Sequence, residues 1–454
     1  MKNVVDAQRG FFNSNVTKSI DFRIQQLRKL KETILKNENL LHEAIYADFK
    51  KSVFESYSSE LGLVLTDIDE AIRKVRKWAK IKRIRTNLIN FPARSYVVPE
   101  PLGVSLIIGA WNYPYLLTLG PIVGALAAGN TVILKPSELA PRTSNALKKI
   151  VSENFKPEYF TVVEGGISET TELLNQKFDK IFFTGSVAVG RIVYQAAAKN
   201  LTPVTLELGG KSPAIIAEDC NLKMTVKRLV WSKFMNAGQS CIAPDFVVVH
   251  RSIKQQFLEL TKAEIEKSHF SFENGNYLQI INESKLMRLV DLVPKEKIYY
   301  GGSYHKENRY FEPTLLQDIS FDDSVMKEEI FGPILPVLEY DNLSVVIDKI
   351  KEMPRPLSCY VFTSNKEIKN RITREISFGG GCINEAVMHI SNSNFGFGGV
   401  GDSGIGAYHG EVGFKAFTHY KSILNKPTWF ELNLKYYPHT ANKLKLIKLI
   451  MKLW

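Results

Sequence analysis

The sequence predicts an α/β protein with a parallel β-sheet in each of two domains, and three observations support this prediction. Four short apolar runs between residues 104 and 183 are each followed by turn residues and by a stretch that can form a helix. Similar runs resume after about residue 210. The chain has 454 residues, which is long for one domain and comfortable for two or three. Continuous apolar runs that alternate with helices are typical of parallel sheets buried on both faces.

Each predicted element follows from a local pattern. Apolar residues at helical spacing between residues 27 and 45, with charged residues between them, predict amphipathic helices over residues 17–80. Short β-branched runs bounded by Gly, Pro or Lys predict the strands. Strands are expected at 104–108, 131–134, 160–163 and 180–183 in the first domain, and at 214–216, 246–249 and 360–362 in the second.

Composition and charge exclude several classes of protein. Hydrophobic residues make up 44% of the chain and charged residues 23%, so a packed globular protein is expected. The formal net charge is +12, but lysine and glutamate are interspersed and no zinc-finger or RNA-binding pattern occurs, so no nucleic-acid partner is expected. The wide spacing of the cysteines argues against a disulfide framework and against a metal site. The four cysteines are Cys220, Cys241, Cys359 and Cys382.

The two ends of the chain bear on localisation. The N-terminus has no apolar segment of the secretory type, and no apolar run is long enough to cross a bilayer, so a cytoplasmic protein is expected. Residues 443–454 predict a short basic amphipathic helix, which would either touch the inner face of a membrane or dock on the protein's own surface. Its apolar face comprises Leu444, Ile447, Ile450 and Trp454, and its basic face comprises Lys445, Lys448 and Lys452.

A strand, a turn and a helix follow one another from Phe182 to Gly190. The free N–H groups and the positive dipole end of a helix N-terminus favour a phosphate group. Gly185 lets the backbone come close, and the Ser186 hydroxyl can donate a hydrogen bond to a phosphate oxygen. The spacing is GxxxxG rather than the GxGxxG of dinucleotide-binding turns, so a purely structural turn is an equal alternative.

Lys135 and Glu138 come directly after the strand predicted at 131–134. Ligands of open α/β sheets bind at the carboxyl ends of the strands. A carboxylate there can accept hydrogen bonds from ribose hydroxyls, and a lysine can donate to them. Taken singly, each residue is also compatible with a solvated loop charge.

Three further residues are candidates for catalysis. Cys241 lies among small residues that leave room for a substrate, and as a thiolate it would be a nucleophile. Glu207 is an acidic residue inside an apolar stretch, where a raised pKa would make it a candidate base. Asn112 follows a strand end, where its amide can donate to an oxyanion. The structural alternatives are a buried cysteine, a paired carboxylate and an N-cap or turn residue.

Seven segments, taken in order, resemble the motifs of the aldehyde dehydrogenase superfamily, and together they cover roughly residues 5–427. The short N-terminus and residues 401–410 are similar to its class 3 and fatty-aldehyde branch. The segments are Trp111-Asn112-Tyr113-Pro114, Leu134-Lys135-Pro136-Ser137-Glu138, Phe183-Thr184-Gly185-Ser186, Leu206-Glu207-Leu208-Gly209-Gly210-Lys211-Ser212-Pro213, Gly238-Gln239-Ser240-Cys241, Glu328-Glu329-Ile330-Phe331-Gly332-Pro333 and Phe397-Gly398-Gly399.

The resemblance implies a role for each matching residue and implies NAD, with NADP as a second possibility, as the cofactor. Cys241 corresponds to the nucleophile, Asn112 and the Cys241 backbone N–H to the oxyanion hole, and Glu207 to the base that activates water. The implied cofactor contacts are Lys135 and Glu138 at the adenosine ribose, Gly185, Ser186 and Gly190 at the pyrophosphate turn, Glu329 at the nicotinamide ribose and Phe331 near the nicotinamide. The implied lining of the aldehyde tunnel is Tyr113, Trp231 and Phe397.

The resemblance also implies the domain organisation, the assembly and the reaction. The reaction is oxidation of an aldehyde, either medium- or long-chain aliphatic or aromatic, to the carboxylic acid. A homodimer is implied, in which the oligomerisation strands pair across the subunits. The implied divisions are a Rossmann-like NAD-binding domain at 1–80 and 103–206, a catalytic domain at 207–412, oligomerisation strands at 81–102 and 413–427, and a basic tail at 428–454.

Some features depart from the family pattern or leave alternatives open. Ser240 stands where relatives often have threonine, and Asn394-Phe395-Gly396 stands where this branch usually has a Leu-Pro pair. The second departure bears on substrate preference. Glu138 favours NAD over NADP, because a carboxylate beside the ribose repels a 2′-phosphate. A CoA-acylating dehydrogenase and a non-catalytic paralogue stay open as alternatives; Glu207 argues against the first, and the joint presence of the three catalytic candidates argues against the second.

Overall fold

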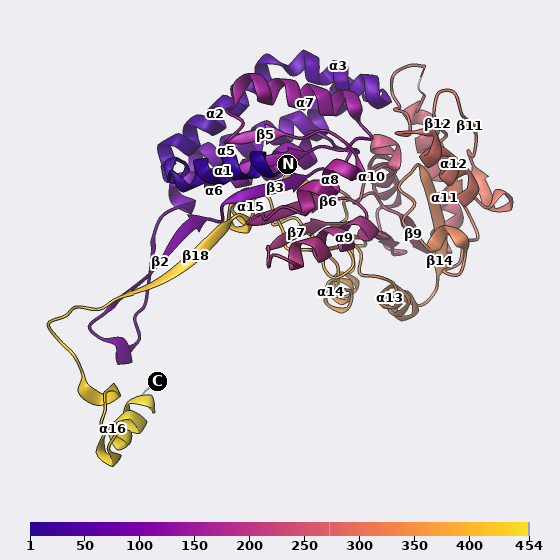
Figure 1. The fold of residues 1–454 in the computed structure, drawn as a ribbon. Helices are drawn as coiled ribbons and strands as arrows, with labels where there is room; N and C mark the ends of the chain where they lie inside the picture. The colour runs from indigo at the N-terminus through magenta and orange to yellow at the C-terminus, as the bar shows by residue number, and fades with distance from the viewer. Residues whose placement is uncertain (272, 453–454) are drawn as a thin grey trace.

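The computed structural model describes residues 1–271 and 273–452 and contains both predicted parallel sheets (Figure 1). The first sheet has the strand order β17-β7-β6-β3-β4-β5, and only the short edge strand β17 runs antiparallel among these six. The four strands predicted in this domain are confirmed, with ends shifted by at most one residue. The strands are β3 (Val104–Ile108), β4 (Thr131–Lys135), β5 (Phe160–Val162), β6 (Lys180–Thr184), β7 (Val204–Glu207) and β17 (Gly404–Ile405).

Alternate residues of the first sheet face two separate hydrophobic layers. Ile107 and Phe182 face the layer that contains α2, α5, α6 and α7, whereas Leu106 and Phe183 face the layer that contains α1, α8 and α9. Every residue of β3, β4 and β6 is buried, as expected for strands covered on both faces. The helices are α1 (Lys2–Asn13), α2 (Ile20–Lys36), α3 (Glu38–Phe49), α4 (Val53–Ser56), the π-helical turn η2 (Tyr57–Leu61), α5 (Gly62–Trp78), α6 (Leu116–Ala128), α7 (Pro141–Asn154), α8 (Ile167–Leu174) and α9 (Val187–Ala198).

The order of the strands creates a crevice at the carboxyl ends of the strands of this sheet. The chain moves outward from β3 through β4 to β5, and it then returns to the other side of β3 as β6 and β7. The loops after β3 and β6 therefore leave the sheet in opposite directions. Open α/β sheets bind their ligands at such a reversal, outside the carboxyl ends of the strands.

The second sheet has the strand order β10-β13-β14-β9-β8-β15-β16 and is parallel except for β10. The three strands predicted here at 214–216, 246–249 and 360–362 are confirmed. The strands are β8 (Pro213–Ile216), β9 (Phe246–His250), β10 (Ile298–Tyr300), β13 (Thr314–Leu316), β14 (Ile334–Tyr340), β15 (Ser358–Phe362) and β16 (Gly380–Ile383), and a hairpin joins β11 (Tyr304–His305) to β12 (Tyr310–Phe311). The helices are α10 (Leu222–Phe234), α11 (Lys254–Ser268), α12 (Glu283–Leu292), α13 (Leu343–Glu352) and α14 (Lys366–Glu375).

A three-stranded antiparallel sheet projects from the body as an arm (Figure 1). It contains β1 (Lys82–Ile84), β2 (Arg94–Pro101) and β18 (Thr418–Asn425), and β2 pairs with β18 over eight residues in unbroken register. The chain reaches β18 through α15 (Gly410–Ala416), so the strand begins at Thr418.

The C-terminal helix α16 (Ala441–Met451) lies beyond the tip of the arm, away from both parallel sheets (Figure 1). None of its residues is buried. Trp454, expected on its apolar face, lies outside the described residues. Within the part of the chain that the structure describes, no helix has the length and apolar character needed to cross a membrane.

Candidate active site

The three predicted catalytic side chains line one cavity of about 530 Å³. The cavity lies at the reversal of the first sheet, where the loops after β3, β4 and β6 meet the end of β7 and the edge of the second domain. Its volume falls within the range of small-molecule sites. The predicted site residues that line it are Asn112, Lys135, Glu138, Gly185, Ser186, Glu207, Cys241, Glu329 and Phe331.

A strained loop carries Cys241 into the cavity. Asn236, Ala237 and Gly238 have φ angles of 54°, 50° and 70°, so three successive residues adopt the left-handed conformation. This conformation is ordinary for glycine and tolerated by asparagine, but it costs alanine about 1–2 kcal/mol. A Cβ atom at Gly238 would lie 2.2 Å from the carbonyl oxygen of Gly332. The sharp turn therefore requires glycine at residue 238, three residues before Cys241, which lines the cavity.

The surroundings of Cys241 favour the neutral thiol in the protein alone. Burial raises the pKa of the Cys241 thiol well above its usual value, and the carboxyl groups of Glu329 and Glu207 raise it further. The backbone N–H groups of Cys241 and Ile242 act in the opposite direction. A positive charge placed in the cavity would favour the thiolate.

The Asn112 amide lies beside the loop that carries Cys241. Asn112 is 3% exposed, and its Nδ2 donates to the Gln239 carbonyl oxygen at 3.1 Å. The backbone carbonyl oxygen of Asn112 accepts from Asn236 Nδ2 at 3.0 Å. Because a side-chain amide has two N–H bonds, one remains for a ligand in the cavity. This arrangement is suited to an oxyanion formed at Cys241.

Glu207 is a buried carboxyl group without a partner. It is the last residue of β7, it is 2% exposed, and neither of its carboxylate oxygens has a hydrogen-bond partner among the described residues. Burial raises its pKa well above the usual value. A carboxyl group whose pKa is raised by burial is a stronger base, once its proton is lost, than an exposed carboxylate.

The same cavity is lined by groups that can bind a dinucleotide. Ser186 is the N-cap of α9, and its oxygen accepts from the Val189 N–H at 3.4 Å, so the hydroxyl proton stays available for a phosphate. Lys135 is buried and donates to the Pro136 carbonyl oxygen at 2.8 Å and to Glu138 at 3.4 Å. The paired ammonium and carboxylate can donate to and accept from a ribose.

Glu329 reaches the cavity from the second domain. Burial and the Asp245 carboxylate raise the pKa of Glu329 to about 8. A Cβ atom at Gly209 would lie 1.9 Å from Glu329 Oε2, so a side chain at that position would displace the carboxyl group. Phe331, in the left-handed conformation at φ 51°, packs edge-on against Trp111 at 5.4 Å between ring centroids.

Comparisons with known proteins show the family of the chain. The model of the aldehyde dehydrogenase family matches residues 2–423. The chain belongs to the aldehyde dehydrogenase family. It is 43% identical to 4,4'-diaponeurosporen-aldehyde dehydrogenase of Staphylococcus aureus, over 98% of this chain and 97% of that protein. It is 40% identical to the dimeric NADP-preferring aldehyde dehydrogenase of the dog, Canis lupus familiaris, over 97% of this chain and 98% of that protein. The substrate-bound structure of Staphylococcus aureus AldH matches with a TM-score of 0.97 at 42% identity and covers 99% of both chains.

The comparisons also confirm the predicted branch of the family. Aldehyde dehydrogenase family 3 members from Arabidopsis thaliana and from mammals match at 39% to 43% identity over at least 96% of this chain. The predicted enzyme class, the α/β fold and a nicotinamide dinucleotide as cofactor agree with these relatives.

Four predicted residues of this aldehyde dehydrogenase do not line the cavity. Gly190 lies inside α9, where a Cβ atom would lie 2.6 Å from a methyl group of Leu208. The glycine therefore allows α9 to pack closely against the residue that follows β7. Trp231 is 45% exposed on α10. Phe397 is buried against His389 and His409, with ring centroids at 6.1 Å and 5.5 Å. Tyr113 is buried with the Lys51 ammonium 4.1 Å from its ring centroid.

Sequence reasoning missed the apolar side of this cavity. Val189 and Ile192 on α9, and Ile167 and Leu174 on α8, line it. Their spacings of three and seven residues indicate one face of each helix, but the pattern alone does not distinguish a ligand face from a core face. Three of these side chains are also strongly exposed, which a core face would not be.

Proposed function

We propose that this aldehyde dehydrogenase oxidises an apolar aldehyde to its carboxylic acid with NAD or NADP through a thioester on Cys241. The observation that supports the proposal is the convergence of three groups on one cavity. A thiol, an amide donor and a carboxyl group line this cavity, and Ser186 and Lys135 line it as well.

The chemistry follows from what each side chain can do. The Cys241 thiolate attacks the aldehyde carbon, and the carbonyl oxygen becomes an oxyanion that accepts from Asn112 and from the Cys241 N–H. The carbon then loses its hydrogen as hydride, and the oxyanion collapses to a thioester. Glu207 takes a proton from water, the resulting hydroxide attacks the thioester, and the acid is released with the thiolate.

The residues present fit a nicotinamide dinucleotide. Ser186 at the N-terminus of α9 would hold the pyrophosphate, Lys135 and Glu138 would hold the adenosine ribose, and Glu329 would hold the nicotinamide ribose. The bound nicotinamide supplies the hydride acceptor. The exposed apolar side chains of α8 and α9 would cover the adenine.

Activity with NAD is expected to exceed activity with NADP, because Glu138 is a carboxylate at the ribose contact. Reduced nicotinamide absorbance is followed with both cofactors and with a series of aldehydes. The series runs from acetaldehyde to hexadecanal and includes benzaldehyde and 4,4'-diaponeurosporenal, which the name of the Staphylococcus aureus relative suggests. We expect kcat/KM to rise with chain length and to be higher with NAD. Higher kcat/KM with NADP would overturn the cofactor preference, and no activity with any aldehyde would overturn the proposed function.

The arm is proposed to join two copies of the chain. β18 is an edge strand, so one row of its backbone N–H and C=O groups is unpaired in a single chain. The dog relative is named as dimeric. Light scattering should therefore give a mass of about twice 51.4 kDa. A mass equal to that of one chain would remove this proposal.

The C-terminal tail is proposed to bind an anionic membrane surface. Trp429, Tyr437 and Leu449 are 77%, 84% and 58% exposed, and α16 carries lysines beside its apolar residues. Each lysine near an anionic surface adds about 1 kcal/mol. Full-length protein should sediment with phosphatidylglycerol vesicles, and protein truncated after Lys426 should not.

A second variant of the tail tests the role of charge without truncation. It replaces Lys443, Lys445 and Lys448 by glutamine, which removes three charges and favours the helix nearly as well as lysine. We expect binding to weaken by about two orders of magnitude for this variant. Equal sedimentation of the truncated and full-length proteins would contradict the membrane proposal.

A further inference from the structure

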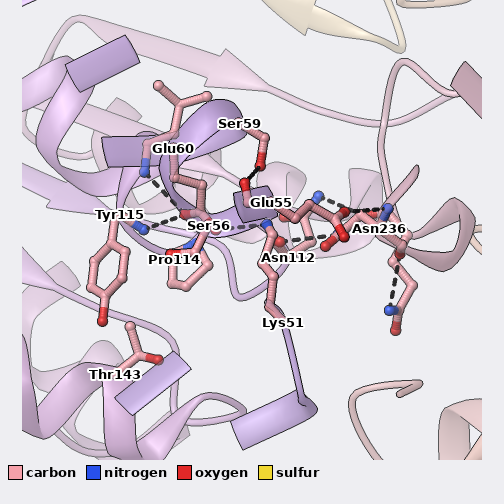
Figure 2. A network of polar contacts seen from close by, with 12 residues as sticks. Lys51, Glu55, Ser56, Ser59, Glu60, Asn112, Pro114, Tyr115, Thr143 and Asn236 are labelled. Carbon is pink, nitrogen blue, oxygen red and sulfur yellow. Dashed lines mark hydrogen bonds and ion pairs between the residues drawn. The ribbon is translucent and has the colours of Figure 1, made fainter. Parts of the chain in front are cut away.

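A short segment of the first domain contacts both loops that form the proposed oxyanion site. It comprises Lys51, helix α4 and the π-helical turn η2, and it carries three charged side chains (Figure 2). One of them, Glu55, is directed to Asn236, whereas the other two point toward each other and contact the start of α6 at Tyr115. None of these charges lines the cavity. They are Lys51, Glu55 and Glu60, and we call them the charged clamp.

The first contact of the charged clamp is with the loop that carries Asn112. Lys51 Nζ donates to Glu60 Oε1 at 2.7 Å, and both side chains are fully buried. Glu60 Oε2 accepts from the N–H groups of Tyr115 at 2.8 Å and Leu116 at 3.3 Å, which are unpaired donors at the start of α6. The Lys51 ammonium also lies over the ring of Tyr113. The ion pair thus holds the residues on the C-terminal side of Asn112.

The second contact is with the loop that carries Cys241. Glu55 Oε1 accepts from the Asn236 N–H at 2.6 Å, at the first residue of the left-handed turn. Asn236 Nδ2 then donates to the carbonyl oxygens of Asn112 at 3.0 Å and Gln239 at 2.9 Å. Glu55 therefore holds the residue that links the two loops.

The π-helical turn explains how one segment reaches both loops. Residues five apart in an α-helix point about 140° away from each other, at about 100° per residue. The i→i+5 hydrogen bonding of η2 widens the turn, so Glu55 and Glu60 come closer to the same side of the helical segment. Burial raises the pKa of Glu55, the nearby Lys51 ammonium lowers it, and the Glu60 carboxylate raises it, so the three charges act on one another. π-Helical turns often occur at functional sites.

We infer that Lys51, Glu55 and Glu60 are positioning residues that set the place of the Asn112 amide relative to Cys241. This inference rests on the proposed function. The side chains of the charged clamp do not line the cavity, so their effect on the reaction would be exerted through Asn112. A buried ion pair contributes little to stability by itself but can select one arrangement of the chain. A displacement of about 1 Å from a reactive geometry can lower a rate by about 10²-fold.

The test is a double-mutant cycle of Glu55 with Asn112. Glu55→Ala removes the acceptor for the Asn236 N–H, and Glu55→Gln retains an oxygen acceptor. We expect Glu55→Ala to lower kcat for aldehyde oxidation by about 10- to 100-fold with less than about a threefold change in the KM of NAD. Glu55→Gln should restore most of kcat. In an Asn112→Ala background, Glu55→Ala should change kcat less than about twofold, because the amide that Glu55 is inferred to position is already absent.

A second pair of variants covers the possibility that Glu55→Ala does not fold. Lys51→Met with Glu60→Leu removes both buried charges together, and with them the acceptor for the N–H groups of Tyr115 and Leu116. We expect this double variant to lose as much kcat as Glu55→Ala. In the Asn112→Ala background, we expect it to change kcat as little as Glu55→Ala does. Glu70→Ala is the matched control, because Glu70 is a buried glutamate with an ion pair to Lys74 on α5, outside the charged clamp. Its kcat should match that of the wild type.

The outcomes separate the inference from the proposed function. A wild-type protein that oxidises no aldehyde overturns the proposed function. The inference is overturned if the wild type is active and Asn112→Ala is impaired, while the folded charged-clamp variants have normal kcat. Equal losses of kcat in the wild-type and Asn112→Ala backgrounds, or a parallel rise in the KM of NAD, also overturn it, because the charged clamp would then support the fold in general.

Discussion

Replacement of Cys241 by alanine is expected to lower aldehyde oxidation by about 10⁴-fold or more. Every proposed intermediate is bound to the Cys241 sulfur, and no other described thiol lines the cavity. Loss of a nucleophile removes the covalent route completely and leaves only what binding and the oxyanion site contribute. The measurement is the steady-state rate of reduced nicotinamide formation with saturating aldehyde and NAD.

The matched control for Cys241→Ala is Cys220→Ala. Cys220 is also partly exposed, but it lies just before α10 and outside the cavity. Cys220→Ala should keep the wild-type rate, and both variants should unfold at nearly the wild-type temperature. Substantial oxidation by Cys241→Ala would mean that the hydride leaves from something other than a Cys241 adduct.

Replacement of Glu207 by glutamine is expected to lower the steady-state rate by about 10²- to 10⁴-fold and to leave the first turnover in place. Glutamine has nearly the shape of the protonated carboxyl group that burial favours, so the site should keep its structure. Thioester formation does not require Glu207, whereas hydrolysis does. A stopped-flow trace should therefore show about one equivalent of reduced nicotinamide per active site, followed by a slow phase.

Two results would contradict this role for Glu207. Loss of the burst together with the steady state would place Glu207 in the first half of the reaction. A normal steady state that rises on addition of CoA would favour the CoA-acylating alternative, because CoA would then take the acyl group and no base for water would be needed. Glu70→Gln is the control for the loss of a buried carboxylate elsewhere.

Much of the fold could be predicted from the sequence because its strands are buried on both faces. β3 and β6 are continuous apolar runs, and a pattern of this kind is visible without knowledge of the partner strands. β14 was not predicted, although it lies in the middle of the second sheet. Pro336 lies inside it, and proline normally argues against a central strand because it has no N–H to donate.

The site was predictable where its residues follow strand ends or belong to a family motif. Asn112, Lys135 and Ser186 are of this kind, and the structure places all three on one cavity. The charged clamp was not predictable. Lys51 and Glu60 belong to an amphipathic helical pattern in which charges normally face solvent, and only the fold shows that both are buried. Nor does local sequence reveal a contact between residues 181 positions apart, such as Glu55 and Asn236.

The central claim is a thioester on Cys241, and mass spectrometry of the Glu207→Gln variant tests it most directly. The variant is mixed with NAD and decanal, quenched in acid within the burst, and digested. We expect the peptide that contains Cys241 to gain the mass of one decanoyl group in place of hydrogen, and hydroxylamine to remove it. Reduced nicotinamide formed with an unmodified Cys241 peptide, or with the acyl group on another residue, would contradict the account.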